Sequence, residues 1–307
     1  MSIATPTHDT EKMPALAADP VRLAGVLAIL VVVLVWAYWT TLAGLVVDWQ
    51  QDDNYSVGQL VPAAAVYLVW SSRRGLRDCP LQTCWWGVLV ILAAQSARFF
   101  GLLFLFESAE RYSLVLTVAG MVLLIGGRQL FRRVFWVLVF LLLMVPLPGR
   151  IHNLVSTPLQ DQAAAGAVFI LELIGTTVTR EGRILLLNDS VPVAVAEACS
   201  GLRMLTAFVV VGSVLAFMVD RPRWQKMTLV AATIPVAILC NLIRLVVTAR
   251  VFLDYGGDAA SRFFHDFAGW TMMPMAIGLL LVVLWVMPRL VLCDSAIDGR
   301  STTVRSS

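Results

Sequence analysis

The sequence has few charged residues. Lys, Arg, Asp and Glu make up 14% of the 307 residues and hydrophobic residues make up 59%, whereas about a quarter of a soluble domain is charged. This shortage excludes an ordinary soluble domain and predicts an all-α integral membrane protein. The first apolar run, at 21–47, is too long for a signal-peptide core and has no clear small-residue cleavage site, so we expect it to be a retained helix.

Eight apolar segments approach or exceed the length of about 18 to 20 residues that crosses a bilayer. They cover residues 21–47, 58–72, 84–106, 113–126, 134–147, 203–219, 227–247 and 270–288. We therefore predict about eight transmembrane helices within one domain over 21–292. A disordered cytoplasmic tail is expected at 1–20 and a second cytoplasmic tail at 293–307.

The loops between these segments alternate in charge. The basic loops contain Arg73, Arg74, Arg77, Arg128, Arg132, Arg133, Arg221, Arg223 and Lys226, and the intervening loops contain Asp48, Asp52, Asp53, Glu107 and Glu110. Basic loops face the cytoplasm by the positive-inside rule, so both termini are predicted to be cytoplasmic. The net charge of +3 then reflects topology, and no nucleic-acid partner is expected.

A long segment between the fifth and sixth predicted spans falls on the outer face. Its part 163–178 is apolar and predicts an outer-surface or re-entrant helix; a further span is the alternative, with the next part crossing back. Residues 183–195 read as a short hairpin around an Asn188-Asp189 turn. Pro192 favours an edge strand.

Cysteine is scarce, with five residues, and this topology exposes only Cys199 to an oxidising compartment. A thiol there without a partner is either an oddity or a nucleophile. Arg244 and His265 lie at the outer ends of the next two spans. A thiol attacking an acyl carbon needs thiolate, an oxyanion donor and an acid, which Cys199, Arg244 and His265 supply in that order. Ser200 could cap the following helix, and Asn241 lies three residues before Arg244, on the same helix face, where it could orient the guanidinium.

Each of these residues also has a structural interpretation. A cysteine in an apolar segment is often a small packed hydrophobe, an arginine near a helix end often snorkels to the membrane surface, and a histidine beside aromatic residues often belongs to the interfacial belt. His152 also faces outward and is a rival general acid. Arg98 lies inside the third span and is predicted to pair within the bundle.

No metal or cofactor site is expected. The other four cysteines, Cys79, Cys84, Cys240 and Cys293, lack neighbouring histidines and are predicted to be structural. No glycine-rich phosphate loop follows a predicted strand.

Three blocks carry a family resemblance: Ala198-Cys199-Ser200-Gly201-Leu202, Asn241-Leu242-Ile243-Arg244 and His265-Asp266-Phe267-Ala268-Gly269-Trp270. They resemble the signature blocks of the exosortase/archaeosortase family of multi-pass membrane proteins. Other stretches resemble family positions in the family order, namely Trp49, Tyr55 to Pro62, Met144 to Pro148, Leu159-Gln160 and Thr179 to Gly182. The chain departs from the family at Val57, where the Tyr-Ser-His-Gly block usually has histidine.

The resemblance implies a cysteine transpeptidase of the bacterial inner membrane, with its active site on the periplasmic face. Its partners would be secreted proteins with a PEP-CTERM-like tripartite signal, together with membrane lipid. Cys199 would attack near the sorting motif, Arg244 would stabilise the oxyanion, and His265 would protonate the departing amine; Ser200, Gly201 and Asn241 would support them. Two other classes remain open at this point: a transporter, and a non-catalytic component of an exopolysaccharide or secretion assembly.

Overall fold

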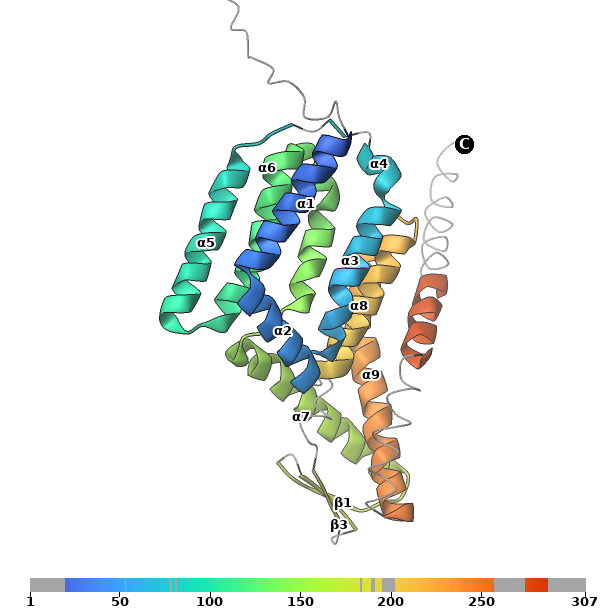
Figure 1. The fold of residues 1–307 in the computed structure, drawn as a ribbon. Coiled ribbons are helices and arrows are strands. Elements are labelled where there is room, and N and C mark those ends of the chain that lie inside the picture. Colours follow the sequence, from blue (N-terminus) through green and yellow to red (C-terminus); the bar gives the residue numbers. More distant parts are fainter. Residues whose placement is uncertain are drawn as a thin grey trace, which may run out of the picture. The chain divides into compact units, whose positions relative to one another are not determined.

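The chain folds mainly as helices. The computed structural model describes residues 20–52, 54–77, 79–80, 82–182, 184–188, 191–194, 202–256 and 274–286. In these ranges three helical segments are long and apolar enough to cross a membrane: α5 (Trp86–Phe104), the segment Glu107–Met144, and α9 (Arg223–Tyr255). The pair α1 (Pro20–Ala37) and α2 (Trp39–Gln51) adds a fourth if its halves, bent by 71°, form one span. The protein is therefore a helical membrane protein (Figure 1).

The prediction of eight spans is not confirmed in number. All eight predicted segments overlap helices, but three of those helices, Ser56–Ser71, Leu202–Met218 and Pro274–Val286, have only 10–17 residues. A perpendicular crossing takes about 20 residues, so these three helices are shorter than a full perpendicular span.

Two of the predicted spans, 113–126 and 134–147, fall largely within α6 (Glu107–Leu141), followed by the short η3 (Leu142–Met144). The helix is interrupted at Gly127, which has φ 71° and ψ −178°. A side chain is strained at this φ, and a Cβ there would collide with the carbonyl oxygen of Gln82. Gly127 thus separates the two segments that the apolar pattern had distinguished.

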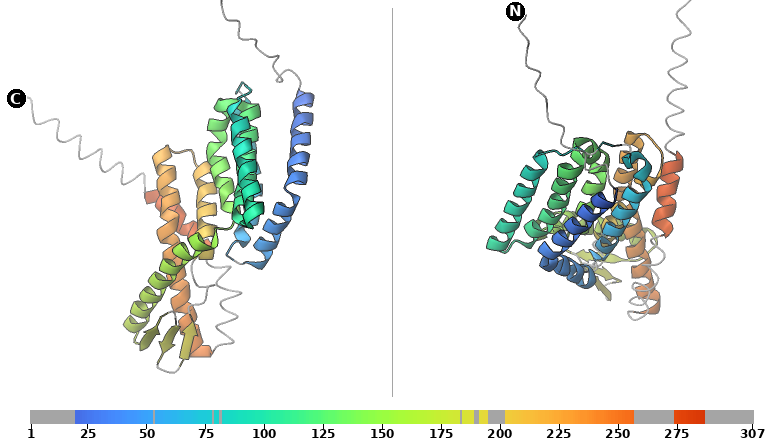
Figure 2. Two further views of the ribbon diagram at one scale, coloured as in Figure 1. Left: turned by 90° about the vertical axis from the view of Figure 1, so that its left-hand side faces the viewer. Right: turned by 45° about the horizontal axis from the view of Figure 1, so that its top comes forward.

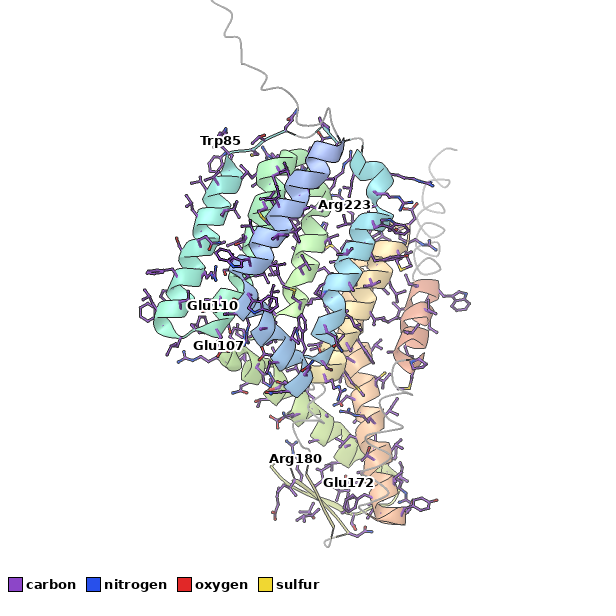
Figure 3. All side chains as sticks on the ribbon, viewed as in Figure 1. Trp85, Glu107, Glu110, Glu172, Arg180 and Arg223 are labelled. Atoms are coloured by element: carbon purple, nitrogen blue, oxygen red, sulfur yellow. The ribbon has the colours of Figure 1, made fainter. Side chains whose placement is uncertain are left out.

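The chain forms two compact units. The first comprises Met1–Val47 and Val69–Leu142 and contains α1, α4 (Arg73–Arg77), α5 and α6. Within it α5 packs closely on α6 because glycines face larger residues, Gly87 against Leu124 and Gly120 against Ile91. Small residues allow such close approach of helices in membranes. Trp85 marks one end of this helix pair, and Glu107 and Glu110 mark the other (Figure 3).

A buried polar network surrounds Tyr38, which lies at the bend between α1 and α2. The Tyr38 hydroxyl lies 2.8 Å from Thr117 Oγ1 and 3.2 Å from Ser113 Oγ. Gln95 Nε2 donates to Tyr38 Oη at 3.2 Å and to Thr117 Oγ1 at 3.1 Å. These bonds satisfy polar side chains that would be costly to leave unpaired in an apolar bundle.

Arg98 also contacts the bend between α1 and α2. Its Nη2 donates to the carbonyl oxygen of Ala37 at 2.5 Å, and its guanidinium lies 4.4 Å from the centre of the Tyr38 ring. Ala37 ends α1, so its carbonyl carries the partial negative charge of a helix C-terminus. The prediction that Arg98 pairs within the bundle is confirmed.

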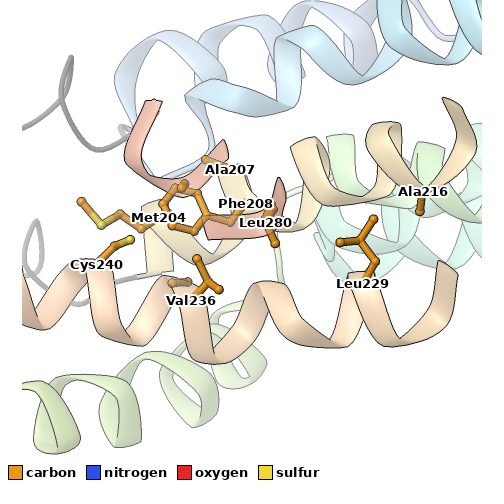
Figure 4. Close-up of a cluster of buried hydrophobic side chains, with 10 residues drawn as sticks. Met204, Ala207, Phe208, Ala216, Leu229, Val236, Cys240 and Leu280 are labelled. Atoms are coloured by element: carbon orange, nitrogen blue, oxygen red, sulfur yellow. The ribbon is translucent and has the colours of Figure 1, made fainter. Parts of the chain in front are cut away.

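The second unit comprises Asp48–Leu68 and Leu143–Ser307. Its larger core cluster joins α8 (Leu202–Met218), α9 and the helix Pro274–Val286 (Figure 4). The cluster consists of Met204, Ala207, Phe208, Ala216, Leu229, Val236, Ala237, Cys240, Ala276 and Leu280. Cys240 is fully buried here, which confirms its predicted structural role.

A second core cluster joins α7 (Gly149–Leu173), the strands and the last third of α9. The buried face of α7 is made of small residues, Ala163, Ala164 and Ala167, which pack with Leu245 and Ala249 of α9. Figure 2 shows α7 running beside this part of α9, with the strands at the end of both. Within this unit, Arg223 at the start of α9 lies at the opposite end from Glu172 and Arg180 (Figure 3).

Three short strands form one antiparallel sheet in the order β1-β2-β3. β2 (Ile184–Leu187) pairs with β3 (Val191–Ala194), with Leu187 opposite Val191, so the predicted hairpin is present. β3, with Pro192, is an edge strand as expected. The sequence analysis missed β1 (Val178–Glu181), which pairs with the other side of β2.

The predicted surface helix at 163–178 overlaps the second half of α7, which begins much earlier, at Gly149, and ends earlier than predicted, at Leu173, because Val178 already belongs to β1. The helix continues through the polar residues before Ala163 because their inward face, Ser156 and Gln160, is buried in the unit. α7 is not among the described helices that are long and apolar enough to cross a membrane.

Candidate functional site

Two of the predicted site residues, Asn241 and Arg244, are described by the structure. Cys199, Ser200, Gly201 and His265 lie outside the described residues. The site is therefore built from the two residues on α9 and from the elements that flank the undescribed ones. Chief among these is α8, which begins at Leu202, three residues after Cys199.

Arg244 is buried, with 7% of its surface exposed, and Asn241 is 2% exposed. Arg244 Nη2 donates to Asn241 Oδ1 at 2.7 Å, as the spacing of three residues on one helix predicted. A guanidinium is a rigid fork of N–H donors that keeps its charge. Holding one arm on Asn241 directs the remaining donors, and the burial does not fit a side chain that extends freely to the membrane surface.

The core of the second unit brings this part of α9 to the beginning of α8. Cys240, the neighbour of Asn241, packs in one cluster with Met204 and Phe208 of the first two turns of α8 (Figure 4). The Asn241–Arg244 turn therefore adjoins the helix start that follows Cys199 in the chain. The same cluster includes Ala276 of the helix Pro274–Val286, which follows His265 in the sequence.

A segment far away in the sequence also reaches this helix start. Thr206 Oγ1 on α8 donates to the carbonyl oxygen of Asn54 at 3.1 Å. Val57, in η2 (Ser56–Gln59), packs against the cluster that contains Met204 and Phe208. At the position where the family block usually has histidine, this chain thus makes an apolar contact with the core.

The same segment is attached to the region before and at the start of α7. Trp49 Nε1 donates to the carbonyl oxygen of Met144 at 2.9 Å, and a Cβ on Gly58 would lie only 2.6 Å from Trp49 Nε1. Tyr55 Oη and His152 Nδ1 are 2.7 Å apart. Residues 49–58 thus connect the beginning of α7 with the beginning of α8.

His152 lies in the first turn of α7 and is partly exposed, whereas Tyr55 is 9% exposed. The Tyr55 hydroxyl is hydrogen-bonded to one ring nitrogen of this histidine, Nδ1. The rival general acid of the sequence analysis is therefore an oriented imidazole, whose phenol partner lies one residue from the Asn54 contact with α8.

Sequence reasoning missed one more buried polar residue, Gln160 on α7. It is 4% exposed, and its Oε1 has no hydrogen-bond partner among the residues that the structure describes. The signal in the sequence was an amide at the i+4 position from Ser156, on the face that continues as Ala163, Ala164 and Ala167. The pairs Trp49–Met144, Tyr55–His152 and Asn54–Thr206 had no such signal, since they join residues 95, 97 and 152 positions apart.

No metal site is evident in the described part of the chain, where no three His, Cys, Asp or Glu residues gather as ligands. The arrangement of the described residues offers hydrogen-bond donors and one imidazole. These groups can stabilise negative charge and move protons.

The fold and these residues define a helical membrane protein with a buried arginine beside the start of a short helix. The family model described as Transmembrane exosortase (Exosortase_EpsH) matches residues 49–282. The chain therefore belongs to the transmembrane exosortase family. Comparisons with curated proteins and with solved structures gave no match.

Proposed function

We propose that this protein is a membrane-embedded cysteine peptidase and transpeptidase. It cleaves the C-terminal sorting signal of secreted proteins at the periplasmic face of a bacterial inner membrane and transfers them to an acceptor. The observation that carries the proposal is the buried Arg244–Asn241 pair beside the start of α8. Membership of the exosortase family supports the same reaction.

Each proposed residue has a role that fits its chemistry. Cys199 attacks the peptide carbonyl as thiolate, which the partial positive charge at the N-terminus of α8 favours. Arg244 donates to the oxyanion as it develops. His265 protonates the amine that departs, and the acyl group stays on Cys199 as a thioester until the acceptor attacks.

The length of α9 supports a site at the membrane surface. Arg244 comes 21 residues after Arg223, the first residue of α9, which is roughly 32 Å along a helix. The hydrocarbon core of a bilayer is about 30 Å thick. A helix that enters the membrane at the basic cytoplasmic end thus presents Arg244 at the opposite surface, with the last third of α9 beyond it.

A site at this depth favours the binding of a substrate that has its own C-terminal transmembrane span. Its span holds the preceding sorting motif at the same membrane surface, so binding becomes nearly intramolecular and the effective concentration rises. The basic tail of the signal remains in the cytoplasm by the same charge rule that orients the enzyme.

The test is processing of a secreted protein with a PEP-CTERM-like tail by Cys199→Ala, followed by gel mobility and intact mass. We expect the substrate to accumulate at full length with its span retained, while the variant still inserts. Cys199→Ser should fail or nearly fail, because an unactivated hydroxyl is a much weaker nucleophile.

The matched control is Cys84→Ala, which removes a partly exposed cysteine of the first unit and should process at the wild-type rate. Normal trimming by Cys199→Ala would refute the nucleophile. It would instead favour a non-catalytic role in a secretion assembly.

A further inference from the structure

We infer that His152, oriented by Tyr55, is a second acid–base residue of this site and acts on the acceptor during release of the acyl-enzyme. The inference rests on the proposed function, because it concerns the second half of that reaction. It starts from a hydrogen-bonded pair that has no role in the first half of the reaction, the formation of the acyl-enzyme. Tyr55 Oη and His152 Nδ1 are 2.7 Å apart, and they join the segment after α2 to the first turn of α7.

The first step is the orientation of the ring. Tyr55 is almost completely buried and belongs to the segment that packs on the core, so its hydroxyl is a fixed partner. When His152 donates its Nδ1 proton to this hydroxyl, Nε2 carries the lone pair. A base whose second nitrogen is held by a third group is the usual arrangement in nucleophilic catalysis.

The second step is location. Asn54, next to Tyr55, accepts the Thr206 hydroxyl from α8 at 3.1 Å, and Val57 packs on the cluster that contains Met204 and Phe208. These are the first two turns of α8, and Cys199 lies three residues before them in the chain. His152 is therefore a partly exposed imidazole that Tyr55 and its neighbour Asn54 connect to the first turns of α8, the helix that follows the nucleophile in the chain.

The third step is the chemistry of release. The acceptor, an amine or water, attacks the thioester carbonyl with its lone pair, and its N–H or O–H bond must break as the new bond forms. Nε2 of His152 takes that proton, the C–S bond of the tetrahedral intermediate breaks, and Cys199 leaves as thiolate. The Nδ1–H of the resulting imidazolium donates to Tyr55, and the proton on Nε2 then returns to solvent or to the thiolate.

The experiment separates the two halves of the reaction in purified, detergent-solubilised full-length enzyme with the same substrate. The first half is release of the C-terminal span, and the second is loss of the acyl-enzyme, measured by intact mass of the enzyme. His152→Gln should release the span at the wild-type rate and then accumulate a thioester on Cys199, with release of that thioester slowed about a hundredfold, on the scale of losing a general base.

Hydroxylamine is the probe for rescue, since its nitrogen is a strong nucleophile that needs little help from a base. It should discharge the thioester of His152→Gln at a rate near that of the wild-type thioester. Tyr55→Phe keeps the ring and removes the hydroxyl, and it should slow the same step by a smaller factor. This second variant keeps the inference testable if His152→Gln does not fold.

Trp49→Phe is the structural control. It removes the neighbouring hydrogen bond to Met144 but leaves the imidazole in place, so it should change both halves equally or neither. Equal slowing of both halves in His152→Gln would overturn the inference, as would wild-type release of the acyl group. Failure of the proposed function looks different, because the wild-type enzyme would then form no adduct on Cys199.

Discussion

At the scale of the residue, Arg244 is the described group whose geometry says most about the reaction. A lysine and an arginine carry the same charge, but only the guanidinium offers a rigid fork, one arm of which is held by Asn241 at 2.7 Å. If the fork binds an oxyanion, lysine cannot reproduce its geometry. If the charge only anchors α9 at the membrane, lysine should replace it.

We therefore expect Arg244→Lys to lower the rate of substrate processing about a hundredfold or more, which is the scale of losing one oxyanion donor. The variant should insert normally and keep a Cys199 thiol that labels from the outside. Arg250→Lys is the matched control on the same helix, since Arg250 is half-exposed and pairs with Asp254 at 3.5 Å. Wild-type processing by Arg244→Lys would exclude the donor role.

At the scale of the element, the start of α8 is attached to the segment before α3 (Leu60–Ser71) by Thr206. Its single hydroxyl proton is shared between two carbonyl oxygens of its own helix, Leu202 O and Arg203 O, each at 3.0 Å, and the carbonyl oxygen of Asn54 at 3.1 Å. Thr228 on α9 makes only the first kind of bond among the described contacts, to Trp224 O at 2.9 Å. The two threonines therefore form a natural comparison.

Thr206→Val should lower the stability of the protein by about 1 kcal/mol, because the Asn54 carbonyl loses its partner. Thermal unfolding of the detergent-solubilised protein should show a lower midpoint for Thr206→Val. Thr206→Ser should restore most of the loss, and Thr228→Val should stay close to wild type. An equal midpoint for Thr206→Val and Thr228→Val would show that the Asn54 contact contributes nothing measurable.

At the scale of the whole molecule, the remaining question is which loops face which side of the membrane. The alternation of basic and acidic loops predicts that reporters fused after Glu110, Leu187 and Gly257 report the outside. Reporters after Arg132 and Arg223 should report the cytoplasm. Fusions to alkaline phosphatase and to green fluorescent protein at each site measure this with opposite signals.

A cytoplasmic signal from the Leu187 fusion would place the sheet, and the Cys199 segment that follows it, on the inner side. The proposed reaction on secreted proteins would then be impossible. The Leu187 and Arg223 fusions also test whether α8, which is short for a crossing, spans the membrane, because α8 lies between them in the chain.

Much of the local structure followed from the sequence because its causes are local. Apolar runs predicted the helices, a turn residue at Asn188 predicted the hairpin between β2 and β3, and a spacing of three residues predicted the Asn241–Arg244 contact. β1 was missed because Val178–Glu181 is mostly exposed and has no alternation of its own. It becomes a strand by pairing with β2.

The sequence by itself determined the membrane class, because apolar composition excludes a soluble fold, and it determined the family through its signature blocks. Only the tertiary structure decided which side chains meet. Gly87 lies against Leu124 where α5 packs on α6, the segment with Tyr55 reaches His152, and Asn54 reaches Thr206, across 97 and 152 positions in the last two pairs. Such contacts depend on the packing of whole helices, and no local pattern of residues specifies them.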